Sequence, residues 1–256
     1  MEDSFEEKLD QLITLHQDMA GVNPALEKCY PVAIAQDESF WIYDLDQKGE
    51  TYQFQRTSLV PMPIPEGTRA AFQIEDYGGR IACVVTPEIF NTLEGYVTIL
   101  HEFVHCYQYE TCEQDLKMKL DIARQAKEKG DCMWEINHPF PYAATNFIEP
   151  YGHFLEALVA GDHKKVMAQR RKLKQYLGLH DFEYMVWQEW KEGFARWVEN
   201  LVKRELGMEE NKGGFRQPYS RVLFYAGGEA YIEYLHKRKP NLARDLKDLF
   251  RHLYLV

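Results

Sequence analysis

The sequence predicts a single α+β domain over residues 1–256, with a small N-terminal antiparallel sheet lobe followed by a mainly helical lobe. Short stretches rich in β-branched and aromatic residues, separated by turn signals, occupy about 25–90. From about 91 to 256 the apolar residues recur at helical spacing instead. With 256 residues, 45% of them hydrophobic and 14% aromatic, the chain can bury a substantial core.

Five strands are predicted in the sheet lobe, at 31–35, 40–45, 51–55, 69–75 and 80–85. Turns that contain glycine, at 47–49 and 76–79, separate neighbouring members of this series. The last strand comes directly before the helical lobe. Two interpretations of it stay open: an edge strand along which an extended peptide would lie, or an ordinary core strand.

The predicted helices begin with an acidic, amphipathic segment in the first 20 residues. In the helical lobe, Thr86 is the expected N-cap of a helix whose first residue is Pro87. A further helical pattern covers 154–176 and breaks near Gly161. Its basic run at 164–174 is expected to form a solvated helix face.

The most informative motif is H-E-x-x-H at residues 101–105. On a helix, His101 and His105 stand one turn apart on the same face, so both ring nitrogens can bind one Zn²⁺. Glu102 can then act as general base on a water at the metal. The apolar residues of this segment cluster on the opposite face, so we expect the histidines to face a cleft or solvent. The alternative is two ordinary helical histidines with a solvated glutamate.

A second helix is predicted around 186–199, where an apolar stripe leaves Glu192 and Glu199 together on the opposite face. Either carboxylate can complete a metal site, or both can form the solvated face of an amphipathic helix. Glu199 is also placed to accept a hydrogen bond from a ligand histidine. Gly193 is costly inside a helix, and a close approach of another helix would explain it.

These motifs together resemble the gluzincin metallopeptidases, most closely the aminopeptidase N type. In that group H-E-x-x-H is followed by an N-E-G-F-A-x-Y-V-E helix, and here residues 192–199 read E-G-F-A-R-W-V-E. The resemblance implies a zincin-like fold, a Zn²⁺ cofactor and Glu192 as the third zinc ligand. Residues 225–228 look like the Y-x-x-G segment of the same group, which implies that Tyr225 hydrogen-bonds the oxyanion of the transition state.

The resemblance covers about 95–110, 186–200 and 219–236, and the long segment 106–185 separates its first two parts. Lys191 stands where the family has asparagine, and no G-x-M-E-N string precedes the motif. That string holds the free amino group of the substrate in the aminopeptidases. The sequence therefore leaves open the substrate, the choice between exopeptidase and endopeptidase, and the role of 106–185.

Composition limits which binding partners and which cellular compartment are expected. A net charge of −10 and a pI near 5.4 argue against nucleic-acid and anionic-membrane partners. The first 20 residues lack the features of a signal peptide, and no stretch is long and apolar enough to span a membrane. Five scattered cysteines suit reduced thiols, so we expect a cytoplasmic protein. Nothing in the sequence predicts the oligomeric state.

The expected function is a zinc-dependent peptidase that acts on a peptide or protein substrate. Three alternatives stay open. The chain can be a zinc-binding pseudo-peptidase with a regulatory or scaffolding role, although Glu102 and Tyr225 argue against that. It can be a zinc hydrolase of a non-peptide substrate, because the same water chemistry permits it. The least favoured alternative is an all-helical interaction protein without metal.

Overall fold

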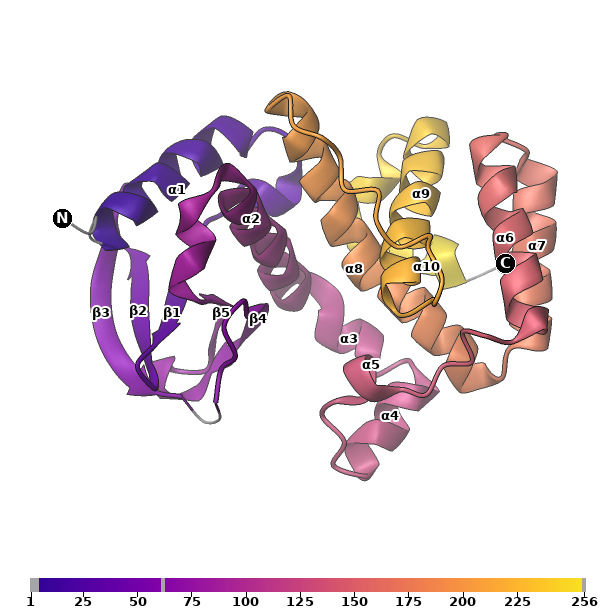
Figure 1. Ribbon diagram of the computed structural model, residues 1–256, viewed down its shortest axis with the longest axis horizontal. Coiled ribbons are helices and arrows are strands. Elements are labelled where there is room, and N and C mark those ends of the chain that lie inside the picture. Colours follow the sequence, from indigo (N-terminus) through magenta and orange to yellow (C-terminus); the bar gives the residue numbers. More distant parts are fainter. Residues whose placement is uncertain (1–4, 61–62, 255–256) are drawn as a thin grey trace. The chain divides into compact units, whose positions relative to one another are not determined.

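A computed structural model describes residues 5–60 and 63–254 (Figure 1). Its contacts divide the chain into two compact units. The sheet unit comprises residues 1–111 and 198–210, and the helical unit comprises 112–197 and 211–256. Helix α8 (Leu179–Glu205) contributes its last residues to the sheet unit and the rest to the helical unit.

The sheet unit is built on five strands in the order β3-β2-β1-β5-β4. Their bounds are β1 (Val32–Gln36), β2 (Ser39–Leu45), β3 (Tyr52–Leu59), β4 (Arg69–Ile74) and β5 (Arg80–Val85). Every predicted strand corresponds to one of them. β1–β2, β2–β3 and β4–β5 are antiparallel, but β1 and β5 are parallel, with Val32 opposite Cys83. The prediction of an antiparallel sheet is therefore wrong at this pair, and the sheet is mixed.

The parallel pairing has a physical reason in the burial of the two strands. Residues 81–85 of β5 and 32–35 of β1 are all buried, as is typical of strands covered on both faces. β2 already occupies one edge of β1, so β5 pairs with the other edge. The interpretation of 80–85 as an edge strand is also wrong, because β3 and β4 form the edges of this sheet.

Two long helices belong to the sheet unit. α1 (Phe5–Met19) contacts β3, and α2 (Leu93–Gln108) contacts β4 and β5. The segment Pro87–Asn91 is a 3₁₀ helix, so Thr86 and Pro87 begin that turn and not α2. The N-cap of α2 is Thr92, whose hydroxyl accepts a hydrogen bond from the Gly95 amide at 3.1 Å.

The helical unit consists of helices that are mostly long, with short ones near its start. After the π-helical turn Tyr109–Glu113 come α3 (Gln114–Lys117), α4 (Asp121–Glu128), α5 (Trp134–Asn137), α6 (Thr145–Val159), α7 (His163–Tyr176), α8, α9 (Val222–Arg238) and α10 (Leu246–Tyr254). The predicted break near Gly161 is confirmed, because this glycine has φ +67° between α6 and α7. None of the described helices has the length and apolar content needed to cross a membrane.

The core of the helical unit is aromatic and contains one fully buried ion pair. Trp187 and Trp190 of α8 pack against Phe250 of α10, with ring centroids 6.3 and 5.8 Å away. Arg170 of α7 pairs with Glu189 of α8 at 2.5 Å, and both side chains are fully buried. The expectation of a solvated basic face on α7 is therefore wrong for Arg170.

Candidate metal centre

The H-E-x-x-H segment lies in α2, and each of its histidines has an acceptor at Nδ1. His101 Nδ1 lies 2.8 Å from Glu199 Oε2, and His105 Nδ1 lies 2.8 Å from Gln108 Oε1. A carboxylate oxygen and an amide oxygen can only accept, so both Nδ1 atoms carry the hydrogen. In a neutral imidazole this tautomer places the lone pair on Nε2, which is the form of histidine that binds a metal.

Three residues form a group that can hold a metal ion. His101, His105 and Glu192 each offer one ligand atom, and these atoms all lie within 4.8 Å of one another. Two imidazoles and one carboxylate are also the donor set of catalytic zinc sites that keep a fourth position open.

Two residues of the motif are buried. His105 is 6% exposed and Glu102 is 7% exposed, so neither side chain faces bulk solvent. Burial, together with the Glu102 charge, raises the pKa values of Cys83 and Cys106. Both thiols therefore stay protonated at neutral pH and are poor metal ligands.

The Glu199 carboxylate lies between the His101 ring and the Lys203 ammonium group and does not face solvent. Its Oε1 lies 3.3 Å from Lys203 Nζ, and Lys203 also pairs with Glu94 of α2 at 2.5 Å. Glu199 is only 8% exposed. The alternative of a solvated face is therefore wrong for this residue, whose carboxylate fixes the ring of His101.

Glu192 lies beside a tight helix crossing within the helical unit. A Cβ atom on Gly193 would be 2.7 Å from Gly228 Cα, and one on Gly228 would be 2.3 Å from the Glu189 carbonyl oxygen. The expected close approach at Gly193 is thus confirmed, and its partner is α9. Since Tyr225 precedes Gly228 by one turn, the crossing brings its ring near Glu192.

The Tyr225 phenol remains protonated in this position. Burial first, and then the Glu192 charge, raises the pKa of Tyr225. Arg196 and Arg221 lie over its ring, with guanidinium carbons 5.4 and 6.0 Å from the centroid. Sequence reasoning did not find these two arginines, since their proximity depends on how α8 and α9 pack.

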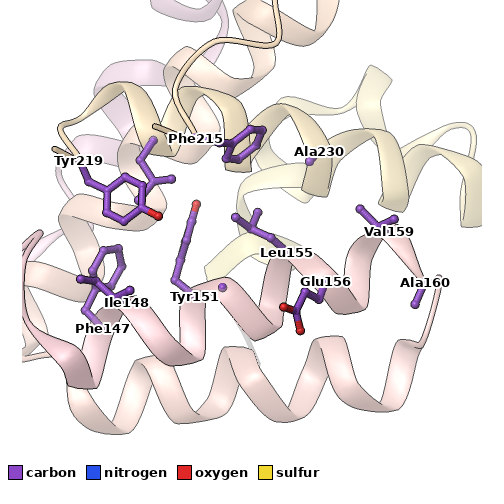
Figure 2. A pocket seen from close by; sticks show the side chains of 12 residues that line it. Phe147, Ile148, Tyr151, Leu155, Glu156, Val159, Ala160, Phe215, Tyr219 and Ala230 are labelled. Atoms are coloured by element: carbon purple, nitrogen blue, oxygen red, sulfur yellow. The ribbon is translucent and has the colours of Figure 1, made fainter. Parts of the chain in front are cut away.

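The other tyrosines near Tyr225 in sequence have different surroundings. Tyr231 is 1% exposed and packs on Phe154 in the core, and the Tyr234 hydroxyl hydrogen-bonds His163 Nδ1 at 3.0 Å. Tyr219 lines an apolar groove of about 580 Å³ (Figure 2). That groove lies among α6, α9 and the segment before α9, and Glu156 is the one charged residue in its lining. It offers no pair of metal ligands.

Two further groups near the candidate site were missed from sequence. Gln108 follows His105 by three residues on α2, and this i, i+3 spacing is the signal that finds it. Lys191 pairs with Glu113 at 3.2 Å and with Glu135 at 3.0 Å. Both glutamates belong to the segment 106–185, which therefore packs on α8 at the residue next to Glu192.

Comparisons of this chain with protein-family models, with curated proteins and with solved structures found no match.

Proposed function

We propose that this chain is a zinc-dependent peptidase of zincin-like fold, with His101, His105 and Glu192 as the zinc ligands. The observation that carries the proposal is the pair of Nδ1 hydrogen bonds, from His101 to Glu199 and from His105 to Gln108. Acceptors at Nδ1 orient both rings and place the lone pair of each neutral imidazole on Nε2, the atom that would bind the metal.

The buried carboxylate of Glu102 supplies the general base. Zinc, when bound, polarises a carbonyl and acidifies water. Glu102 follows His101 directly on α2 and is 7% exposed, so bulk water does not compete for its carboxylate. It takes the proton of the attacking water and delivers it to the leaving amine.

Tyr225 is the proposed oxyanion donor. Its protonated phenol stands beside Glu192 in the helical unit, because α8 and α9 cross at Gly193 and Gly228. A hydroxyl that hydrogen-bonds the substrate oxygen as negative charge develops there stabilises the transition state more than the ground state.

A peptide substrate is supported by the motif resemblance and by the edge of the sheet. β4 is an edge strand, and α2 packs on β4 and β5. An extended peptide adds readily to such an edge through main-chain hydrogen bonds. All five cysteines are free, which suits a reducing compartment, and we therefore propose that the protein works in the cytoplasm.

The test compares zinc-loaded wild type with Glu102→Gln on fluorogenic peptide libraries with free and blocked termini. Glu102→Gln removes the base and keeps every ligand, so zinc content should be unchanged while hydrolysis falls roughly 10²- to 10⁴-fold. Zinc content is measured by mass spectrometry on the same samples.

Two results would contradict the proposal. Zinc-loaded wild type that cleaves no member of broad libraries would favour a zinc-binding pseudo-peptidase or a hydrolase of another bond. Cleavage that is equal in wild type and Glu102→Gln would show that the observed activity does not use this base.

A further inference from the structure

Arg221, the N-cap residue of α9, is a half-buried cation without a carboxylate partner among the described residues. Several other buried or half-buried cations of the helical unit do have such partners. Lys117 pairs with Glu135 at 2.6 Å, Lys191 pairs with the same carboxylate, and Arg170 pairs with Glu189. Since partial burial costs hydration, an unpaired guanidinium here calls for an explanation.

The surroundings of Arg221 connect it with the candidate site. Its guanidinium carbon lies 6.0 Å from the centroid of the Tyr225 ring. Its charge also opposes the rise in the pKa of Tyr225 that burial and Glu192 produce, and it acts in the same sense on Tyr142 and Tyr184. Arg221 therefore lies among phenols beside the proposed oxyanion donor.

Arg196, the second cation over the Tyr225 ring, is more buried than Arg221 and donates a hydrogen bond to the backbone. It is 6% exposed, and its Nη1 donates to the Gly213 carbonyl oxygen at 2.7 Å. This bond anchors the segment before α9 to α8. Arg221 is more exposed than Arg196, so its guanidinium is the more accessible of the two cations over the Tyr225 ring.

We propose that Arg221 binds a carboxylate group of the substrate beside Tyr225. A guanidinium presents a planar fork of donors that matches a carboxylate, and such charge-assisted hydrogen bonds are among the strong ones. The whole chain has a net charge of −10, so this local cation selects for an acidic group that the rest of the surface would repel. The inference rests on the proposed peptidase function and specifies its substrate class.

The carboxylate can be the C-terminus of a peptide or an aspartate or glutamate side chain, and three probe pools distinguish these sources. All are N-acetylated tetrapeptides. The first pool lacks acidic residues and ends in a free carboxylate, the second is its C-terminal amide, and the third is amidated with one Asp or Glu. Binding to zinc-loaded Glu102→Gln is measured by calorimetry, because this variant does not consume the probes.

The expected result is tighter binding of one carboxylate-bearing pool than of the neutral amide, by roughly 10- to 100-fold. Arg221→Met in the same background should abolish this preference, and Arg221→Lys should retain part of it. Arg238→Met is the matched control. Arg238 also lies on α9 with its guanidinium 5.7 Å from a tyrosine ring, that of Tyr234, and its loss should leave the preference unchanged.

Equal binding of all three pools, or a preference that survives in Arg221→Met, would overturn the inference. A preference that survives would indicate that the carboxylate binds the zinc instead. Failure of the peptidase proposal gives a different pattern, in which wild type cleaves no peptide. The carboxylate preference and its dependence on Arg221 are then still measured by binding.

Discussion

Gly193 of α8 and Gly228 of α9 meet backbone to backbone, since a Cβ on the first would lie 2.7 Å from the Cα of the second. This contact explains a glycine in the middle of each helix, where alanine would otherwise be favoured by about 1 kcal/mol. It also determines which residues of the two helices are neighbours. Glu192 and Tyr225 come together because their helices cross at this point.

Replacing Gly228 with Ala should therefore lower the free energy of unfolding. The new methyl group would meet the backbone of Glu189, which cannot rotate away, and overpacking of this kind costs about 1–3 kcal/mol or more. Gly152→Ala is the matched control, because Gly152 is also helical but has nothing within 4 Å of the added Cβ. It should be neutral or stabilising in urea unfolding. Equal effects of the two changes would contradict the crossing.

Tyr225→Phe should reduce kcat by roughly 10²-fold or more with little change in KM. The substitution removes only the hydroxyl, which is expected to act on charge that develops in the transition state. Steady-state kinetics on a library-derived peptide would measure this, with zinc content as a check. Tyr219→Phe and Tyr231→Phe are the controls, and a larger loss in either than in Tyr225→Phe would reassign the donor.

Glu199→Gln should weaken zinc binding by roughly 10- to 100-fold without abolishing it. The carboxylate that accepts from His101 Nδ1 becomes a neutral amide, so the ring is less basic and less firmly oriented. Glu94→Gln is the control, since Glu94 pairs with the same Lys203 but is more than half exposed. If both substitutions lowered zinc affinity equally, the loss would come from the charge removed beside Lys203 and not from the hydrogen bond to His101.

The ion pairs around Lys191 predict that the free energy of unfolding falls as the pH is lowered into the acid range. Burial alone would raise the pKa of Glu135, but the charges of Lys191 and Lys117 outweigh it and lower the pKa to about 2. Because the folded pKa lies below the unfolded value of about 4.3, this stabilisation is full above pH 4.3 and is lost as pH falls toward 2. Wild type should thus lose more stability between pH 5 and pH 3 than Glu135→Gln.

Urea unfolding at pH 5, 4 and 3 measures that difference. Glu110→Gln is the control, since its partner Lys28 is 56% exposed and a surface pair of this kind contributes little. Its pH dependence should follow that of wild type. If Glu135→Gln also follows wild type between pH 5 and pH 3, then the Glu135 carboxylate is not stabilised by its lysines.

The strands were predictable from sequence because runs of β-branched and aromatic residues and glycine turns are local signals. The parallel pairing of β1 with β5 was not, since it depends on the path of the long intervening chain between two strands far apart in sequence. Thr86 and Pro87 carry correct helix-start signals, yet they begin a 3₁₀ turn. The capping signal does not fix which helix type follows it.

For the candidate site, spacing along one helix was sufficient to identify candidate residues on that helix. It did not show which residues of other helices they contact. H-E-x-x-H fixes two histidines and a glutamate on α2, and the same helical spacing could have found Gln108, which was missed. The pairing of Lys191 with Glu113 and Glu135 depends on contacts far apart in sequence. The burial of Arg170 was missed for the same reason, because its partner Glu189 lies on another helix.

Zinc affinity tests the proposed ligands His101, His105 and Glu192, and it is measured by competition against a chromophoric chelator, starting from metal-free protein. Wild type and Glu102→Gln should each bind one zinc per chain with the same affinity, because Glu102 is not a ligand. Glu192→Ala should bind more weakly by over roughly 100-fold, a greater loss than that of Glu199→Gln. Glu192→Ala that binds one zinc with wild-type affinity would contradict the account.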